Sequence, residues 1–190
     1  MRDRLSCRSD SSDEELLSLV RSGDRLAFAE LMQRHLDPLH AYLARLMASR
    51  SDAEDLTQET FLRIWQKAHS YHRQRGKVST WIYRIAHNLC VDAFRKRSEL
   101  SNTTALETAY YPDDHLEHQA AREAHSRLAL AVAELPENQR AAVLLCQVRG
   151  FSNAEAAQIM ALNLTALESL LARARRKLRE KVFIDEGDSR

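Results

Sequence analysis

The stretch SNAEAAQIMALNLTALESLLARARRKL, residues 152–178, decides the fold expected for the C-terminal part of this chain. Its first four residues form a capping box, in which a serine and a glutamate satisfy the free amides of a helix start, and they predict a short helix over 154–160. A tight turn follows. A further capping box, TALE from Thr165, predicts a long basic helix that runs to about Val182. A short helix, a tight turn and a basic second helix are the pattern of a helix-turn-helix.

The second helix of this motif has two different faces. Apolar residues at spacings of three and four predict a buried face, made of Leu167, Leu170, Leu171, Ala174 and Leu178. The other face is small and polar near the helix start and basic further along, which suits base edges in a major groove and the phosphates beside them. The candidate DNA contacts are Thr165, Ala166, Glu168, Ser169, Arg173 and Arg176. For Glu168 two roles are open: it accepts a hydrogen bond from a cytosine amino group, or it only closes the helix cap, which we favour.

The composition of the 190 residues extends the helical prediction to the whole chain. Only 4 glycines and 3 prolines occur, so the turns that sheets and barrels need are scarce. Hydrophobic residues make up 44%, enough for one core or two small ones. No apolar run approaches the roughly 18 residues of a membrane span, and the charged first residues do not resemble a secretory signal. We therefore expect an all-α, cytoplasmic protein.

Helical periodicity divides the chain into two small domains. Helices are expected over 13–22 and 25–47, separated by Gly23, and two more lie on either side of a polar loop. The first of those two begins at a capping box, SDAE from Ser51. Residues 98–114 lose the periodicity and end in an acidic stretch that contains a proline, as expected of a flexible linker, which we extend to residue 124. The predicted architecture is an N-terminal helical bundle (13–97), an acidic linker (98–124) and a C-terminal helix-turn-helix domain (125–184).

One more helix is expected ahead of the helix-turn-helix. Pro136 suits its first turn, and Gly150 is a natural residue just beyond its end. Val143, Leu144 and Val148 form the core stripe expected along it.

Charge is segregated along the chain although the formal net charge is only +1. Nine basic residues and one acidic residue lie between Arg63 and Arg97, and six acidic residues and one basic residue lie in 98–125. Six basic and two acidic residues follow in 165–181. Solvated helix faces are one explanation. Two basic units on either side of an acidic tether favour a polyanionic partner instead.

The most basic stretch, YHRQRGKVSTWIYR at 71–84, interleaves aromatic and cationic side chains. Aromatic faces and arginines hold unpaired bases, and each stacked base contributes about 1–3 kcal/mol. The stretch therefore indicates binding of single-stranded nucleic acid, with a polar stripe of Thr80, Arg84 and Asn88 aligned with the loop. For Trp81, packing in the core is an equal alternative.

Three segments together resemble the extracytoplasmic-function (ECF) branch of the bacterial sigma-70 sigma factors. DAEDLTQETFLRIW at 52–65 is similar to region 2.2, and TWIYRIAHNLCVDAFR at 80–95 is similar to regions 2.3 and 2.4. LPENQR at 135–140, with RARRKLR at 173–179, looks like region 4. The segments occur in the family's order, and the resemblance covers about residues 13–97 and 125–182.

The resemblance implies a specificity subunit of RNA polymerase that directs the enzyme to promoters and helps open the DNA. In the family, region 2.2 docks on the polymerase β′ subunit; the matching positions are Asp52, Glu54, Asp55, Gln58 and Glu59. For Asp52 and Glu54, capping and helix-dipole roles are the alternative. The next loop captures a base flipped from the promoter −10 element, and the following helix lies along that DNA. The matching candidates are Tyr71, Arg73, Arg75, Lys77, Thr80, Trp81, Arg84, Asn88 and Arg95. The second helix of region 4 reads the −35 element as duplex.

The partners that the resemblance implies are core RNA polymerase, through its β′ and β subunits, promoter DNA, and an anti-sigma factor that is either free or anchored in a membrane. Insertion of this chain itself into a membrane is not expected. The chain departs from the family at Glu168 and Leu170, where a basic pair is common. A stand-alone helix-turn-helix regulator of a duplex operator is the alternative function.

Catalysis and cofactor binding are not expected. There is no nucleophile elbow, Walker loop or dinucleotide fingerprint, and the three cysteines lack a CxxC spacing. His69 with His72, and His115 with His118, have a spacing seen in metal sites, but solvated polar side chains are the more common explanation. No catalytic residue, metal ligand or cofactor is therefore predicted.

Overall fold

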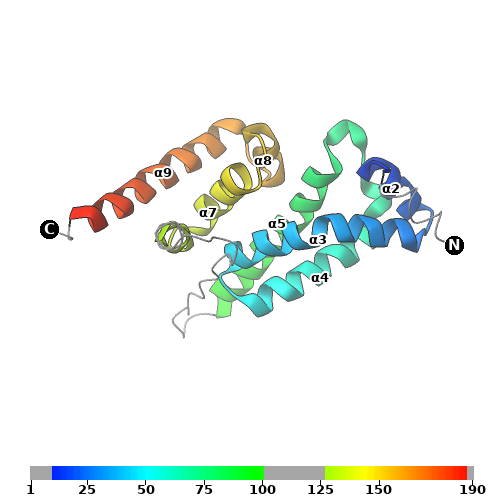
Figure 1. Cartoon of the computed structure of the whole chain (residues 1–190), viewed down its shortest axis with the longest axis horizontal. Helices are drawn as coiled ribbons and strands as arrows, with labels where there is room; N and C mark the ends of the chain where they lie inside the picture. The colour runs from blue at the N-terminus through cyan, green and yellow to red at the C-terminus, as the bar shows by residue number, and fades with distance from the viewer. Residues whose placement is uncertain (1–9, 101–126, 188–190) are drawn as a thin grey trace. The chain divides into compact units, whose positions relative to one another are not determined.

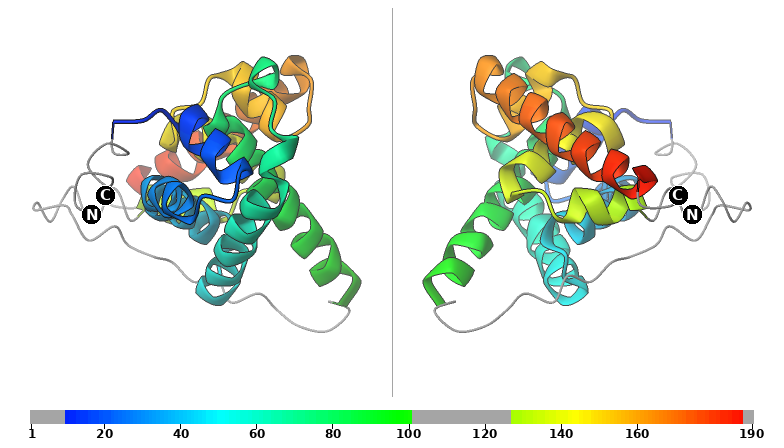
Figure 2. Two further views of the ribbon diagram at one scale, coloured as in Figure 1. Left: turned by 90° about the vertical axis from the view of Figure 1, so that its right-hand side faces the viewer. Right: turned by 90° about the vertical axis from the view of Figure 1, so that its left-hand side faces the viewer.

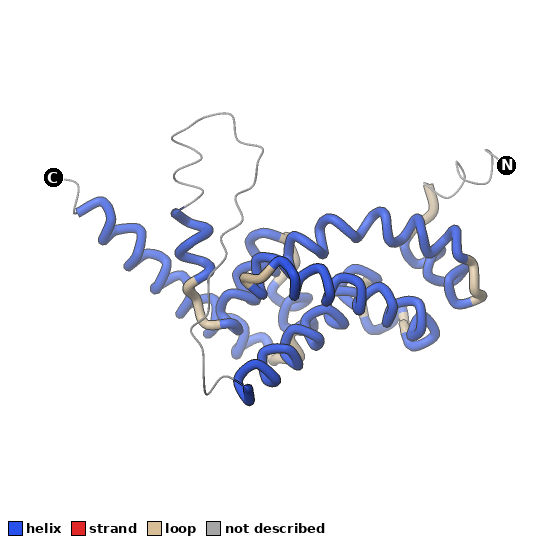
Figure 3. The backbone as a smooth tube through the Cα atoms, turned by 90° about the horizontal axis from the view of Figure 1, so that it is seen from below, coloured by secondary structure: helices blue, strands red, loops and turns tan. Residues whose placement is uncertain are grey.

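A computed structural model describes residues 10–100 and 127–187, and all regular structure in these two ranges is helical (Figure 3). The described residues divide into two compact units, one made of 10–43 and 51–100 and the other of 127–187 with 44–50. The prediction of an all-α chain with two helical domains is confirmed.

The first unit contains four α-helices, apart from residues 44–47 at the end of α3 and Arg50 at the start of α4, and two short 3-10 turns (Figure 1). They are α2 (Asp13–Arg21), α3 (Arg25–Met47), α4 (Arg50–Lys67), η1 (Ala68–Ser70), η2 (Arg73–Arg75) and α5 (Val78–Leu100). The helices predicted on either side of Gly23 are present, and Gly23 itself has a φ of +86°, a left-handed conformation that glycine adopts without strain. Helix α5 continues three residues past the predicted domain end at Arg97, so 98–100 are helical; the rest of the predicted linker, 101–124, lies outside the described residues.

Capping side chains fix two of the helix starts in this unit. Ser12 and Glu15 form a capping box at α2, with the Glu15 carboxylate accepting from the Ser12 amide at 2.8 Å. Asp24 caps α3 by accepting from the amides of Leu26 and Ala27. The box predicted at Ser51 is wrong, because α4 already begins at Arg50 and Ser51 lies inside its first turn.

Aromatic side chains join the long helices of the first unit. Phe28, near the start of α3, meets the rings of Phe61 and Trp65, near the end of α4, at centroid distances of 6.4 and 5.2 Å. The two helices are therefore antiparallel, as Figure 1 shows. From α5, the buried Tyr83 donates to the Pro38 carbonyl of α3 at 3.1 Å. These contacts hold α4 and α5 against α3.

The second unit is a helical domain built on one long helix. Helical residues 127–133 are followed by α7 (Glu137–Val143), the π-helical turn η3 (Leu144–Val148), α8 (Asn153–Ile159) and α9 (Leu164–Gly187). Helices α7 and α8 both pack against α9 (Figure 2). Their shared core is made of small and branched residues: Ala142, Leu144, Leu145, Ala156, Ile159, Leu167, Leu171 and Ala174.

The predicted helix-turn-helix is present as α8, a tight turn and α9. The capping box at Ser152 is confirmed: its hydroxyl accepts from the Glu155 amide, and the Glu155 carboxylate accepts from the Ser152 amide. The box predicted at Thr165 is wrong. Asn163 occupies the cap instead, and its Oδ1 accepts from the Ala166 amide at 2.7 Å. Since α9 starts at Leu164, Thr165 is already helical.

The helix ahead of this motif differs from its prediction in two details. Pro136 lies at the N-cap rather than inside the first turn. Val143 and Leu144 are buried as expected, but Val148 is 47% exposed. The π-helical turn that ends at Val148 adds a residue to the helical repeat, so the apolar stripe rotates away from the core there. Gly150 follows with a φ of +73°, as expected of a residue beyond a helix end.

Candidate nucleic-acid and protein interfaces

The first half of α4 presents an acidic and polar face. Glu54, Asp55 and Gln58 are exposed at spacings of three and four, so they share one side of the helix. Asp52 and Glu59 are half-buried and pair with basic neighbours: Asp52 with Arg97 of α5, and Glu59 with Arg63 at 2.8 Å. The opposite side, with Ala53, Thr57, Thr60, Phe61 and Ile64, is buried. The structure thus brings three of the five predicted polymerase-contacting side chains to an open surface.

The basic loop between α4 and α5 is built around Tyr71. This side chain is only 8% exposed, its hydroxyl donates to the Gly76 carbonyl at 3.0 Å, and its ring meets that of Trp81 edge-on at 5.7 Å. Burial raises the pKa of Tyr71, and the nearby Glu14 carboxylate adds to the rise. Gly76 has a φ of +128°, so the bend here favours glycine. Tyr71 is therefore a buried residue that stabilises the loop, and little of its side chain is open to solvent.

The loop residues around Tyr71 include several exposed cations. Arg73, Arg75 and Lys77 are exposed, and Trp81 is half-buried. The His72 ring contacts the Ser70 carbonyl through Nδ1 at 2.8 Å, which leaves Nε2 facing outward from that bond. The loop thus presents cations around a partly covered indole.

Helix α5 continues the basic surface. Arg84, Asn88 and Arg95 are exposed, and Arg95 pairs with Asp92 of the same helix at 3.2 Å. Thr80, placed with them in the predicted stripe, is 3% exposed and its Oγ1 has no hydrogen-bond partner among the described residues. Each step of four residues turns a side chain by about 40° around a helix of 3.6 residues per turn. Thr80 is thereby turned into the core, while Asn88 reaches the surface.

Helix α9 carries the predicted recognition surface. Thr165, Glu168, Ser169, Arg173 and Arg176 are exposed and Ala166 is half-buried. On the other side, Leu167, Leu171 and Ala174 are buried as predicted, and Leu170 and Leu178 are half-buried. The Glu168 carboxylate forms no hydrogen bond with the described residues, and Asn163 provides the cap instead. Of the two roles open to Glu168, the helix cap is wrong.

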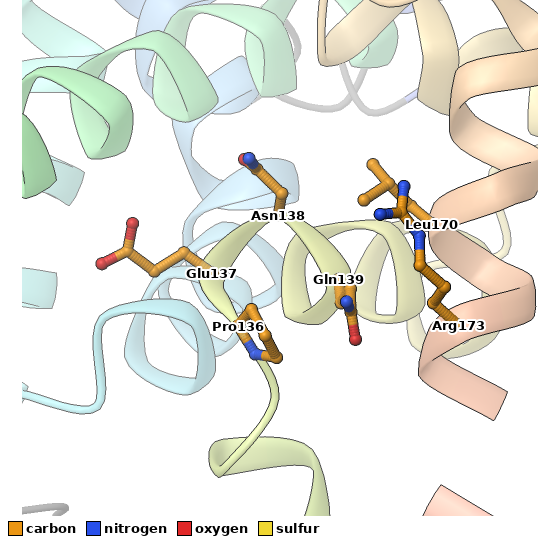
Figure 4. Close-up of a pocket in the computed structure, with 6 residues that line it drawn as sticks. All are labelled: Pro136, Glu137, Asn138, Gln139, Leu170 and Arg173. Atoms are coloured by element: carbon orange, nitrogen blue, oxygen red, sulfur yellow. The ribbon is translucent and has the colours of Figure 1, made fainter. Parts of the chain in front are cut away.

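A pocket of about 520 Å³ adjoins this surface, between α9 and the start of α7. Asn138 and Gln139 line it from α7, and Leu170 and Arg173 line it from α9 (Figure 4). The Arg173 Nε donates to the Ser169 carbonyl at 3.1 Å, which holds the side chain along its helix. The pocket therefore places an oriented guanidinium beside the recognition face.

Sequence reasoning missed the contribution of α2. Glu14, Ser18 and Arg21 of this helix line a pocket of about 640 Å³ together with Tyr71 and other residues of the basic loop. Nothing in the sequence of α2 indicated this, because its exposed residues read as an ordinary solvated helix face and its place beside the loop depends on the fold.

The described residues hold no group of three or more His, Cys, Asp or Glu side chains that could bind a metal ion. His115 and His118, one of the two pairs considered above, lie outside the described residues. None of the described helices is long and apolar enough to cross a membrane.

Helical bundle and helix-turn-helix, each with exposed basic residues, define a class of nucleic-acid-binding protein. Comparison with protein families identifies it further: residues 31–99 match Sigma-70 region 2, and residues 125–178 match Sigma-70, region 4. The chain belongs to the ECF subfamily of the sigma-70 family of RNA polymerase sigma factors. Its function is that of a transcription initiation factor, as the resemblance in the sequence implied.

Relatives with this function cover nearly the whole chain. The ECF RNA polymerase sigma factor SigM of Mycobacterium tuberculosis is 37% identical over 172 residues, which span 90% of this chain and 85% of SigM. RpoE of Cereibacter sphaeroides is 30% identical over 175 residues, 91% of this chain and 97% of RpoE.

Two solved structures share the fold. CnrH in complex with the cytosolic domain of CnrY aligns with a TM-score of 0.69 and 26% identity over 92% of this chain and 99% of CnrH. RpoE of Bartonella quintana, in complex with the anti-sigma factor NepR, gives a TM-score of 0.70 and 26% identity over 83% of this chain and 98% of RpoE.

Proposed function

We propose that this chain binds core RNA polymerase through α4 and holds the two promoter elements with separate units, the −10 strand with the first and the −35 duplex with the second. The observation that carries the proposal is the separation of charge on the first unit. Acidic and polar side chains occupy the exposed face of α4, whereas cations occupy the following loop and α5. An acidic face suits a protein partner, while the cations suit a nucleic acid.

For the polymerase contact, Asp55 and Gln58 are the central candidates because both are exposed and neither side chain makes a hydrogen bond with the described residues. Glu54 lies beside them. Asp52 and Glu59 contribute through their ion pairs, which hold α5 and Arg63 in place around this face. The partners proposed here are the β′ subunit for this face and β for other parts of the chain.

For the −10 strand, Arg73, Arg75, Lys77, Arg84, Asn88 and Arg95 supply the exposed contacts. Trp81 offers part of its ring for stacking, while Tyr71 and Thr80 act from the interior as supports of the loop and of α5. For the −35 duplex, the exposed face of α9 enters the major groove, with Arg173 and Arg176 on phosphates. Because Asn163 caps the helix, the Glu168 carboxylate is available to accept a hydrogen bond from a cytosine amino group.

An anti-sigma factor is a further proposed partner. Its support is that CnrH was solved with the cytosolic domain of CnrY and Bartonella quintana RpoE with the anti-sigma factor NepR. We place the chain in the cytoplasm, where its polymerase is, and assign it no catalytic step of its own. Family membership favours this function over a stand-alone regulator that binds a duplex operator.

The test is run-off transcription with purified core polymerase on a promoter library, using variants that separate the two faces. Asp55→Ala should weaken core binding in a competition assay, and Arg84→Ala should leave core binding intact but reduce promoter opening in a permanganate footprint. Asp37→Asn is the matched control, because Asp37 is exposed on α3 outside both surfaces. Unchanged core affinity for Asp55→Ala would remove the α4 face, and full opening by Arg84→Ala would remove the α5 surface.

A further inference from the structure

The pocket beside the basic loop is lined by the loop on one side and by a separate helix, its wall, on the other. Tyr71 lines it from the loop, where it is held by a hydrogen bond to Gly76 and by ring contact with Trp81. Helix α2 forms the wall and packs against both η1 and α5. At about 640 Å³ the pocket falls within the range of about 300–1,000 Å³ usual for ligand sites.

The wall presents one line of polar side chains. Glu14, Ser18 and Arg21 are spaced by four and three residues, so they lie on the same face of α2. None of the three makes a hydrogen bond or ion pair with the described residues. Glu15 also lines the pocket, but its carboxylate is already used in the capping box with Ser12. Glu14 is therefore the carboxylate that remains for a ligand.

The burial of Glu14 also suits contact with a ligand inside the pocket. It is half-buried, while Ser18 and Arg21 are exposed, and its charge acts on the buried Tyr71 hydroxyl. A carboxylate only accepts hydrogen bonds, so a ligand that fills the pocket must offer it a donor. Arg73 and Gln74, on the loop side, supply donors for the ligand's acceptors.

We infer that Glu14 is a specificity-determining residue that accepts a hydrogen bond from the exocyclic amino group of the flipped base. This rests on the proposed capture of the −10 strand by the loop after α4. Adenine, cytosine and guanine each carry an amino group. Thymine has none. Its single donor, the ring N3–H, lies between two carbonyl oxygens, which repel a carboxylate. A site that provides an acceptor binds a ligand less well when the ligand pairs with it poorly. The α2 wall thus selects against thymine at the captured position.

The experiment uses holoenzyme assembled from core polymerase and the full chain, with a DNA library randomised across the −10 element. Wild-type holoenzyme should exclude thymine at one position, and Glu14→Ala should admit it there, a change of about 5- to 150-fold in relative affinity if the contact matches a good base-specific pair. Asp37→Asn, which removes one exposed carboxylate elsewhere in the same unit, should keep the exclusion. Thermal melting verifies that each variant is folded.

Base analogues then test the amino group directly. Replacing a preferred adenine by purine, or a preferred cytosine by pyrimidin-2-one, removes the amino group and leaves no donor in its place. The replacement should weaken wild-type binding and leave Glu14→Ala unaffected. If Glu14→Ala excludes thymine as strongly as the wild type does, the inference is overturned although the capture of the strand stands. If the wild-type holoenzyme shows no base preference anywhere in the −10 element, the proposed function fails with it.

Discussion

His87 is a titratable side chain enclosed by the core of the first unit. It is 5% exposed on α5, and its Nδ1 lies 3.4 Å from the Tyr42 hydroxyl of α3. Burial without a carboxylate partner lowers the pKa of His87 to about 4, so the ring is neutral at physiological pH. The sequence offered no reason for a histidine here. In the structure it fills the interface of α3 and α5 as a neutral polar ring beside two buried tyrosines.

This burial predicts a pH dependence of stability. Above the unfolded pKa of about 6.5 both states carry neutral His87. Between pH 6.5 and about 4, His87 is protonated in the unfolded chain but stays neutral in the folded chain. The free energy of unfolding therefore falls as the pH falls. The loss from this group is about 1.4 kcal/mol per pH unit and about 3 kcal/mol in total. Urea unfolding at several pH values should show a shallower slope for His87→Gln than for wild type. The exposed His69→Gln variant should keep the wild-type slope; equal slopes for all three proteins would refute the role of His87.

At the scale of single elements, Asn163 is the residue that starts α9. Its Oδ1 accepts from the Ala166 amide, which would otherwise have no partner in the first turn. Asn163→Ala should therefore cost about 0.5–2 kcal/mol of stability. Glu168→Ala should leave stability nearly unchanged, because Glu168 is exposed and takes no part in the cap. Chemical denaturation measures both. Holoenzymes that contain either variant can then be tested on promoters with altered −35 elements. Glu168→Ala should change the base preference there, and Asn163→Ala should not.

The helices themselves were predictable from the sequence, but their exact starts were not. Apolar spacing located α2, α3, α4 and α5 because each buries one face in a local core. Several residues near a helix start have side chains that can cap it, and the sequence does not show which one does. At α9 the Asn163 side chain, not that of Thr165, accepts from a first-turn amide, that of Ala166. The π-helical turn ending at Val148 was also beyond the sequence, since a period of 3.6 residues was assumed throughout.

The candidate sites were predictable as regions and less so as individual side chains. The cations of the loop and of α9 are exposed as expected, because charged side chains avoid burial. Tyr71 and Thr80 suit either a surface or a core by residue type, and the structure buries both. The α2 wall required knowledge of tertiary neighbours: Glu14 and Tyr71 are far apart in sequence and line one pocket.

At the scale of the whole molecule, the chain has two basic surfaces but little energy for separating DNA strands. Opening about ten base pairs costs roughly 14 kcal/mol at about 1.4 kcal/mol per step. Stacking of two or three captured bases returns only about 1–3 kcal/mol each. We therefore expect the surfaces proposed on α5 and α9 to select a promoter, and the polymerase to supply the remaining free energy of opening.

The last prediction follows from that deficit. The free chain should bind promoter duplex weakly and give no permanganate reactivity, whereas the same chain with core polymerase should open the promoter. A template with a mismatched bubble at the −10 element removes the cost of melting, so the free chain should bind this template more tightly than it binds the ordinary duplex. Arg84→Ala should reduce the affinity for the bubble, since Arg84 is exposed on the surface proposed for the parted strand, while Asp37→Asn should not. Opening of ordinary duplex by the free chain would contradict this division of energy, because the chain would then supply a free energy that its described contacts do not contain.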